Sequence, residues 1–143
     1  MQIPQELFYT ATHEWARRLP APHSAAARQA GEAEIMVGIT AHAQEELRDV
    51  VFVELPAVGK VLKQGEPAAV IESVKAAFDI YAPVSGTVTR VNEAVSKSPQ
   101  TVNQDCYGAG WLFAVAPSSS EECSALLSAG DYARQLQQPQ QST

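Results

Sequence analysis

The 143-residue chain contains little cysteine and little histidine, and neither type is arranged as a metal site. Its two cysteines, Cys106 and Cys123, have no closely spaced partner, which excludes the paired-cysteine zinc and redox motifs. Its three histidines, His13, His23 and His42, lack the spacing of two ligands on one helical face. We therefore expect the cysteines to fill space in the fold and the histidines to be surface or structural residues.

The charge and hydropathy patterns exclude two further classes of protein. The formal net charge is −6, so the cationic surface with which proteins neutralise nucleic-acid phosphates has no obvious source. No apolar run approaches the ~18 residues that indicate a membrane span, and the opening residues do not follow the pattern of a signal peptide. We expect a cytoplasmic protein with neither nucleic-acid nor membrane partners.

Two enzyme signatures are also missing from the sequence. Neither a glycine-rich phosphate loop nor the Gly-x-Ser-x-Gly turn of a nucleophilic serine occurs. A chain of this length can bury about two thirds of its unfolded surface, so it can fold as one domain without disulfides. We expect a single domain that is not an enzyme.

Strand patterns dominate the chain after residue 34. The segments are short, β-branched or aromatic, and separated by Pro, Gly, Asn or Asp, which is typical of a compact all-β barrel or sandwich. They read IMVGIT, VVFVEL, PAAVIES, FDIYA, GTVTRV and WLFAVA.

Two helices are expected beside the strands. Thr40 can cap a short helix with the sequence AHAQEELRD. Later, SSSEECSALLSAGDYARQL begins with two overlapping capping boxes, Ser118 with Glu121 and Ser119 with Glu122. An apolar helical period follows these boxes, so the whole segment is predicted to be helical.

Two stretches are expected to be irregular. Residues 17–34, RRLPAPHSAAARQAGEAE, have no apolar periodicity and predict an extended surface loop. Residues 137–143, QQPQQST, predict a disordered tail. The expected domain therefore spans residues 1–136.

One lysine lies inside a strand, turn and strand pattern. In IESVKAAFDIYAPVSG, residues 71–86, Lys75 is flanked by apolar or small residues, and a faint internal repeat lies on either side of it. The repeated positions are Gly59, Val61, Gly65 and Glu66, matched by Gly86, Val88, Asn92 and Glu93. If a pseudo-two-fold axis relates the two halves, SVKA becomes the tip of a β-hairpin, with Lys75 in solvent.

Several motifs carry a resemblance that spans nearly the whole domain. They are HEW at 13–15, VGIT with AQ at 37–44, DVVFVELPAVG at 49–59, ESVKA at 72–76, Asp79, YAPVSG at 81–86, Val91 with Asn92, and GW at 110–111. With these motifs the sequence resembles the H-protein family of the glycine cleavage system, whose members are lipoyl carriers.

The resemblance implies both a fold and a cofactor. The fold is mainly β, a flattened lipoyl-domain-like barrel (barrel-sandwich hybrid) of two antiparallel sheets with a short helix and a C-terminal helix. The cofactor is lipoate in amide linkage to Lys75. Acylation removes the charge of the amine and leaves a long neutral arm, and a tight hairpin would give that arm a rigid base.

The resemblance also implies a set of partner enzymes and a monomeric carrier. A pyridoxal-phosphate glycine decarboxylase loads an aminomethyl group from glycine onto the arm. An aminomethyltransferase passes its carbon to tetrahydrofolate and releases ammonia, and a flavin-dependent dihydrolipoyl dehydrogenase reoxidises the dithiol. Lipoate-attaching enzymes are further partners.

The family pattern places three more residues at a cleft that would protect the loaded arm. Glu14 and Asp79 could meet the ammonium of the arm with a carboxylate, and Thr12 could offer a hydroxyl. Burying the methylene chain of the arm in this cleft would stabilise the bound arm by about 0.8 kcal/mol per CH₂. Glu14 could instead be an ordinary surface acid, and Trp15 is expected to be a core residue.

Alternatives from other classes remain open at this point. Lipoyl domains of 2-oxo acid dehydrogenases are shorter and commonly carry DKA at the turn, whereas this chain has VKA. An H-like protein that relays lipoate, or only binds a partner, would have nearly the same sequence. Phe78 departs from the family pattern, because a small polar residue is usual three positions after the lysine.

Overall fold

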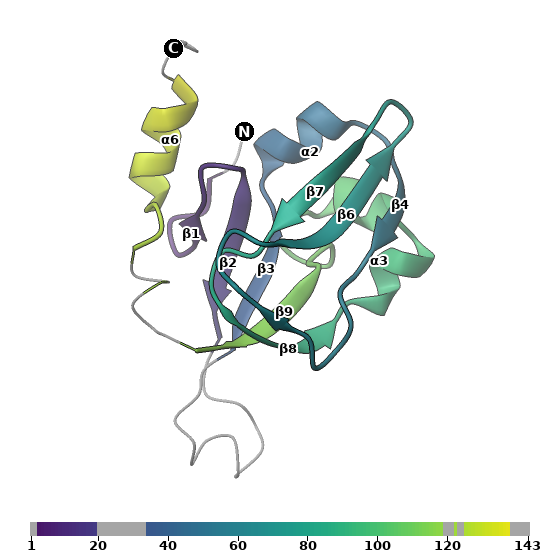
Figure 1. The fold of residues 1–143 in the computed structure, drawn as a ribbon. Helices are drawn as coiled ribbons and strands as arrows, with labels where there is room; N and C mark the ends of the chain where they lie inside the picture. Colours follow the sequence, from purple (N-terminus) through teal and green to yellow (C-terminus); the bar gives the residue numbers. More distant parts are fainter. Residues whose placement is uncertain (1–2, 20–33, 119–121, 123–124, 138–143) are drawn as a thin grey trace.

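The computed structural model describes residues 3–19, 34–118, 122 and 125–137 (Figure 1). The strands are β1 (Phe8–Tyr9), β2 (Glu14–Arg18), β3 (Ile35–Ile39), β4 (Val50–Glu54), β5 (Val61–Leu62), β6 (Pro67–Ser73), β7 (Ala77–Tyr81), β8 (Gly86–Val91) and β9 (Phe113–Pro117). The helices are α2 (Ala41–Leu47), α3 (Glu93–Lys97), α4 (Gln100–Gln104) and α6 (Ala129–Gln137). Within these described ranges, no helix is long and apolar enough to cross a membrane.

The strands form two antiparallel sheets. The larger sheet has six strands in the order β1-β2-β3-β9-β8-β5, and the smaller has three in the order β4-β6-β7. Figure 1 shows β6 and β7 crossing in front of β3 and β9, with α6 apart from them beside β1. The expected fold, a mainly β barrel-sandwich hybrid of two antiparallel sheets, is confirmed.

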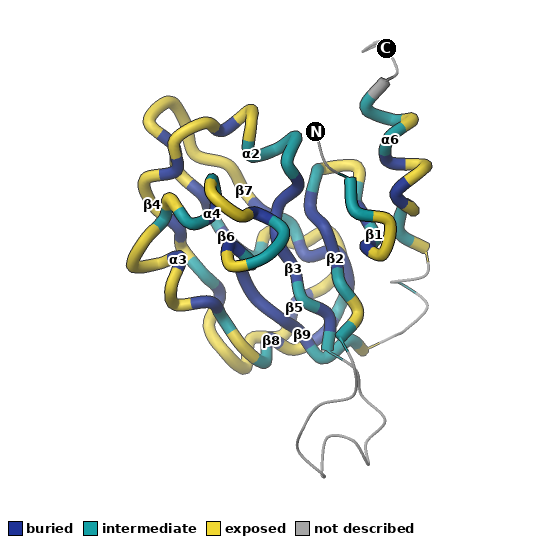
Figure 2. Tube along the Cα trace, turned by 180° about the vertical axis from the view of Figure 1, so that it is seen from behind, coloured by how far each residue is buried: buried dark blue, intermediate teal, exposed yellow. Residues whose placement is uncertain are grey.

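The main core lies between the two sheets. In β6, Ala69 and Ile71 are buried whereas Glu72 is exposed, because alternate residues of a strand face opposite sides. Four of the five residues of β3 are buried, since this strand lies inside the larger sheet. Figure 2 shows this buried interior, with the exposed positions gathered at the outer turns and around α3. Fully burying a Val, Leu or Ile side chain contributes about 1.5–3 kcal/mol.

A second apolar cluster joins β1 and β2 to α6. Its buried members are Leu7, Tyr9, Trp15, Ala129 and Tyr132. Trp15 is fully buried, as expected for a core residue, and its indole N–H donates to the Cys106 carbonyl at 2.9 Å. A Cβ at Gly38, which pairs with Trp15 across the sheet, would lie 2.5 Å from the indole ring. The glycine therefore makes room for the tryptophan.

The short helix after β3 begins where the sequence predicts. The Thr40 hydroxyl accepts from the Ala43 N–H at 3.3 Å, so Thr40 is the N-cap of α2. The helix ends at Leu47, two residues earlier than expected, and Arg48 follows with φ 65°. Helices α3 and α4 were not expected, although the Asn92 side chain caps α3 through the Ala94 N–H.

The prediction of one helix over residues 118–136 is wrong. Residues 125–128 are not helical, because Leu127 exchanges two backbone hydrogen bonds of 2.8 Å with Tyr9. Helix α6 starts after this bridge, where the Ser128 hydroxyl accepts from the Asp131 N–H. Residues 119–121 and 123–124, which include parts of both capping boxes and Cys123, lie outside the described residues.

The strand β2 was not among the predicted strands, and it continues into the segment predicted to be a surface loop. Arg17 and Arg18 were assigned to the surface loop, but they pair with Met36 and Ile35 on β3. The Arg17 guanidinium also lies 5.3 Å from the centre of the Trp15 ring, which favours the extended strand. Residues 20–33 of the expected loop and 138–143 of the expected tail lie outside the described residues, whereas residue 137 ends α6.

Candidate functional site

Lys75 lies at the tip of the hairpin formed by β6 and β7. The first strand ends at Ser73 and the second begins at Ala77, so Lys75 is in the turn between them. Lys75 is exposed, and its neighbour Val74 is 75% exposed. Figure 1 shows this hairpin projecting from the body of the molecule. The lysine amine is therefore presented to solvent on a two-stranded support.

The Ser73 side chain holds this turn together. Its hydroxyl oxygen accepts from the backbone N–H groups of Lys75 and Ala76, both at 3.3 Å, and its hydroxyl can donate to the Ala76 carbonyl at 3.2 Å. The Val74 N–H donates to the Asp49 carbonyl at 3.3 Å, which ties the turn to the chain just before β4. The backbone on both sides of the lysine is thus fixed while its side chain stays free.

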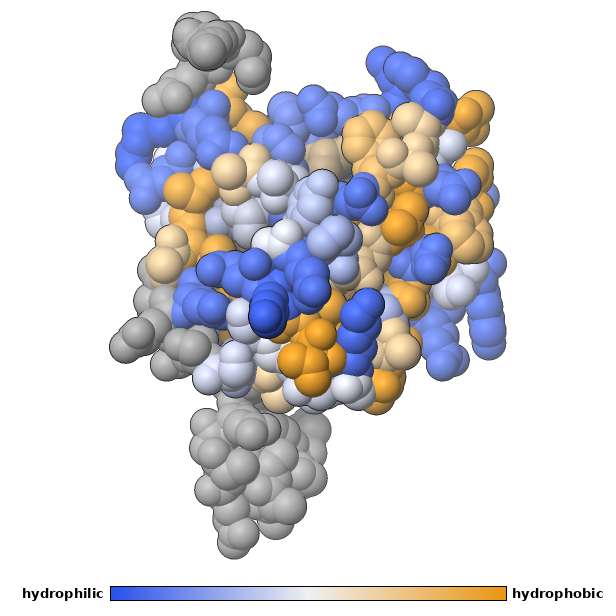
Figure 3. Space-filling model, in the orientation of Figure 1, coloured by the Kyte–Doolittle hydropathy of each residue, from blue (hydrophilic) through white to orange (hydrophobic). Residues whose placement is uncertain are grey.

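The hairpin also exposes apolar side chains. Phe78 pairs with Ile71 on β6 and remains 41% exposed, and Phe52 on β4 is 45% exposed. Figure 3 shows apolar and polar surface side by side at this end of the molecule. The bulky ring at position 78 is therefore part of the accessible surface near the lysine.

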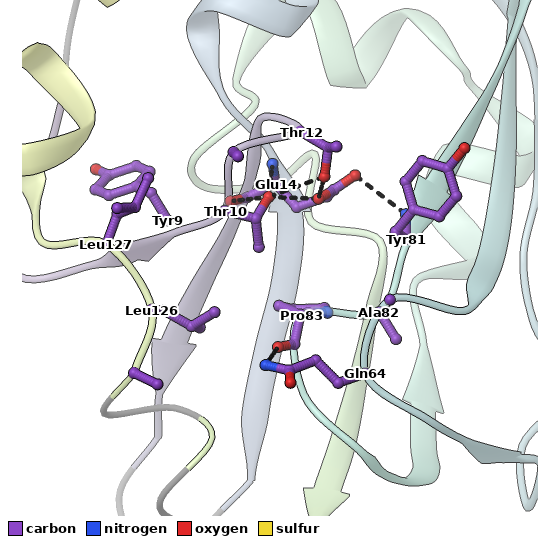
Figure 4. A pocket seen from close by; sticks show the side chains of 13 residues that line it. Tyr9, Thr10, Thr12, Glu14, Gln64, Tyr81, Ala82, Pro83, Leu126 and Leu127 are labelled. Atoms are coloured by element: carbon purple, nitrogen blue, oxygen red, sulfur yellow. Dashed lines mark hydrogen bonds between the residues drawn. The ribbon is translucent and has the colours of Figure 1, made fainter. Parts of the chain in front are cut away.

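A cleft of about 260 Å³ opens at the other end of β7. The turn between β1 and β2 forms one wall, the end of β7 forms another, and the segment before α6 closes the side (Figure 4). Its lining residues are Tyr9, Thr10, Ala11, Thr12, Glu14, Gln64, Gly65, Tyr81, Ala82, Pro83, Ala125, Leu126 and Leu127. Much of this lining is apolar, and Glu14 is the one carboxylate among the described residues that form it.

Glu14 is a buried carboxylate with three hydrogen-bond donors. The hydroxyls of Thr10 and Thr12 donate to its Oε1, each at 2.5 Å, and the Tyr81 N–H donates to its Oε2 at 3.0 Å. The side chain is only 1% exposed. Burial raises the pKa of Glu14, and these hydrogen bonds to the carboxylate oppose the rise.

The other predicted cleft residues lie in different surroundings. Thr12 lines the cleft and donates to Glu14, so these two residues are brought together. Asp79 is exposed on β7 between the hairpin turn and Tyr81, and it is not part of the cleft lining. The structure therefore separates Asp79 from the pair formed by Glu14 and Thr12.

Sequence reasoning missed several residues that build the cleft. Thr10 and the Tyr81 N–H bind the carboxylate as directly as Thr12 does. The spacing Thr-x-Thr-x-Glu is a signal that could have identified Thr10. Leu126 and Leu127 come from the far end of the chain and give no comparable signal, because the bridge between Leu127 and Tyr9 brings them to the cleft.

Two of the three histidines lie close together beside the cleft, although they are far apart in the sequence. The rings of His13 and His42 have centroids 4.4 Å apart, and the His42 Nε2 lies 3.2 Å from a Glu46 carboxylate oxygen. Burial, with a smaller effect from His42, lowers the pKa of His13. Within the described part of the chain, no group of three or more His, Cys, Asp or Glu side chains is arranged to hold a metal ion.

Comparisons with known proteins agree with this architecture. Residues 7–139 match the family model described as Glycine cleavage H-protein. The glycine cleavage system H protein of Thermus thermophilus is 49% identical over 137 residues, covering 96% of this chain and 98% of the relative. That of Rubrobacter xylanophilus is 53% identical and covers 96% and 97%. A crystal structure of the Mycobacterium marinum glycine cleavage system H protein is similar with a TM-score of 0.79 and 41% identity, covering 93% and 98%.

Proposed function

This chain belongs to the glycine cleavage H-protein family and is a lipoyl carrier of the glycine cleavage system, and we propose that Lys75 carries its lipoyl group. The position of Lys75 in the exposed hairpin turn carries this proposal. The chain has four lysines, all in its described part. Lys60 and Lys63 lie next to or within the turns around β5, and Lys97 ends α3.

The residues around Lys75 fit an acylated lysine. The turn fixes the backbone through Ser73 and leaves the lysine side chain in solvent, while the small Ala76 leaves room for an attaching enzyme. The bound lipoyl group would supply a disulfide that can accept the cargo and be reduced to a dithiol. The protein would supply the rigid hairpin, the lysine side chain that lengthens the arm, and the cleft that shields its end.

The cleft lies within reach of an arm on Lys75. The six residues of chain from Lys75 to Tyr81, the first residue of β7 that lines the cleft, span at most about 20 Å. A fully extended lipoyl-lysine side chain measures about 15 Å from its Cα to the ring, and the opened, aminomethyl-loaded arm measures about 18–20 Å to its amino group, by summing its bonds. A loaded arm folded back along β7 would therefore pass Asp79 and bring its amino group to the mouth of the cleft at Tyr81.

We propose that Glu14 and Thr12 receive the cationic end of the loaded arm. Amino groups carry a positive charge near neutral pH, and Glu14 is the carboxylate that lines the cleft. The apolar Leu126 and Leu127 would cover the methylene chain and exclude water. The exposed Asp79 lies on β7 between Lys75 and the cleft, so the cationic end of the arm would pass its carboxylate before it reaches Glu14.

The proposed partners are the other components of the system. They are the pyridoxal-phosphate glycine decarboxylase, the tetrahydrofolate-dependent aminomethyltransferase, dihydrolipoyl dehydrogenase and the enzymes that attach lipoate. We propose that the chain is a cytoplasmic monomer that has no glycine-dependent activity of its own. Light scattering of the purified protein and fractionation of the source cells test the first two statements.

Reconstitution with the decarboxylase tests the proposed function. The lipoylated protein should stimulate exchange of bicarbonate into the carboxyl group of glycine, and neither the unmodified protein nor Lys75→Arg should do so. The isolated chain should show no exchange alone. If the lipoylated protein failed to stimulate an active decarboxylase, a lipoate relay outside glycine oxidation would be the better account.

A further inference from the structure

The C-terminal helix α6 contacts the turn that carries Glu14. Its Tyr132 is fully buried and stacks on Tyr9 of β1, with ring centroids 4.7 Å apart and planes inclined by 6°. One turn further along the helix, the Gln135 side-chain N–H donates to the Ala11 carbonyl at 3.3 Å. The helix therefore meets the turn of residues 10–14 at more than one point.

The Tyr132 hydroxyl joins two segments next to the cleft. It lies 2.7 Å from the His13 Nδ1 and 2.8 Å from the Thr40 hydroxyl oxygen. The Thr40 oxygen already accepts from the Ala43 N–H. Each hydroxyl has a partner when the Thr40 hydroxyl donates to the Tyr132 oxygen and the Tyr132 hydroxyl donates to the His13 Nδ1. In this arrangement the His13 Nδ1 carries no proton and accepts the hydrogen bond.

His13 is held in a backbone conformation that few residues with a side chain adopt. Its φ is 74°, and within the described residues only Arg48 among the other non-glycine residues also has a positive φ. The His13 N–H donates to the Thr10 carbonyl at 3.2 Å, and its carbonyl accepts from the Thr40 N–H at 3.0 Å. His13 directly precedes Glu14, so its conformation sets the direction in which the carboxylate enters β2.

We propose that Tyr132 is a positioning residue for Glu14, because its hydroxyl holds His13 in the left-handed conformation and so fixes the turn that brings the carboxylate to the cleft. This inference rests on the proposed role of Glu14 toward the loaded arm. The stacked ring of Tyr132 packs against Tyr9, whereas its hydroxyl aligns the turn that carries His13 and Glu14. Removing the hydroxyl alone separates the two contributions.

The chain offers a matched control for this substitution. Tyr9 is the other ring of the stacked pair and is equally buried, but its hydroxyl donates to the Pro4 carbonyl at 2.6 Å, away from His13. Tyr132→Phe and Tyr9→Phe each remove one buried hydroxyl and keep the stack. A purely structural role would make the two variants behave alike.

The first measurement follows the Glu14 carboxyl by carbon-13 NMR titration in the unmodified protein. The bonds from Thr10, Thr12 and Tyr81 depend on the position of the turn and favour the ionised form. In Tyr132→Phe the titration midpoint should move to higher pH, and in Tyr9→Phe it should stay at the wild-type value. Adding His13→Gly to Tyr132→Phe should move the midpoint back, because glycine adopts a positive φ without strain.

The second measurement is the decay of the lipoylated, aminomethyl-loaded protein after the partner enzymes are removed. Loss of one aligned hydrogen bond should make decay in Tyr132→Phe about threefold to tenfold faster than in the wild type. An unchanged Glu14 midpoint in Tyr132→Phe, or equal shifts in both tyrosine variants, would overturn the positioning role. If Glu14→Gln itself left decay unchanged, the proposed role of Glu14 would fail, and the titration would still decide whether Tyr132 positions it.

Discussion

At the scale of single residues, Glu14 combines burial with three hydrogen bonds to its carboxylate. Burial favours the neutral acid, while the donors from Thr10, Thr12 and the Tyr81 backbone favour the anion. Each carboxylate oxygen has more than one lone pair, so a cationic ligand in the cleft could be accepted in addition to these donors. The same balance makes the stability of the fold depend on pH.

Glu14→Gln should remove one component of that pH dependence. The pKa of Glu14 is raised above its ordinary value of 4.5, so ionising it costs the folded state more than the unfolded state. The stability of the wild type relative to Glu14→Gln should therefore be greatest below pH 4.5 and should fall as pH rises through the folded pKa. Urea unfolding of both proteins at several pH values measures this. A constant difference, or one that grows with pH, would contradict the raised pKa.

Some of these residues could be predicted from the sequence and others could not. The turn at Lys75 could be predicted from a local strand, turn and strand pattern, whereas Glu14 and Thr12 were expected at the cleft only because the sequence resembles the H-protein family. Thr10 was overlooked although it lies two residues away. The Tyr81 N–H and Leu127 reach the cleft through pairings between distant segments, which a sequence pattern does not contain.

At the scale of elements, one small side chain makes three hydrogen bonds to the backbone at the tip of the β6–β7 hairpin. Ser73 is the last residue of β6, and its hydroxyl bonds to the backbone of Lys75 and Ala76. The strands behind it were predictable, because PAAVIES and FDIYA are short segments with β-branched or aromatic residues. The turn geometry was predictable only as a hairpin, without the role of the serine.

Ser73→Ala should loosen the tip and leave the strands in place. Replacing the hydroxyl removes its bonds to the turn, at a cost of about 1 kcal/mol. Hydrogen exchange at the amides of Lys75 and Ala76 should become faster, while exchange in the middle of β6 should stay slow. Ser96→Ala, at an exposed position of α3, is the control. Equal protection of the turn amides in wild type and Ser73→Ala would show that the strands alone hold the tip.

The C-terminal segment shows why local propensity was insufficient. Its capping boxes and apolar period favour one helix, but the bridge between Leu127 and Tyr9 interrupts it at residues 125–128, and α6 starts after the bridge. The short helices α3 and α4 were missed because the local sequence signal was too weak. Each spans only five residues, too few to show a helical period.

At the scale of the whole molecule, two apolar clusters hold the fold together. One fills the space between the sheets, and the other joins the β1–β2 edge of the larger sheet to α6. The second cluster also supports the cleft, since Tyr9 and Leu127 belong to both. The stability of the fold and the proposed protection of the arm are thus connected through the C-terminal helix.

Tyr132→Ala should destabilise the protein much more than Tyr132→Phe. The alanine variant empties the space between Tyr9 and α6, and truncations of buried aromatic side chains cost about 3–5 kcal/mol. Urea unfolding should show a lower midpoint, and fluorescence of the buried Trp15 should change because that residue packs in the same cluster. A loss below about 1 kcal/mol would mean that α6 contributes little to the folded core.

The central claim is that this carrier holds its lipoyl group on Lys75, and site-resolved mass spectrometry tests it most directly. Protein treated with a lipoate-attaching enzyme should gain one lipoyl mass, and fragmentation should locate it on Lys75. Lys75→Arg should gain none, although Lys60, Lys63 and Lys97 are all exposed. A lipoyl group found on any of those three lysines, or a full lipoyl mass on Lys75→Arg, would contradict the account.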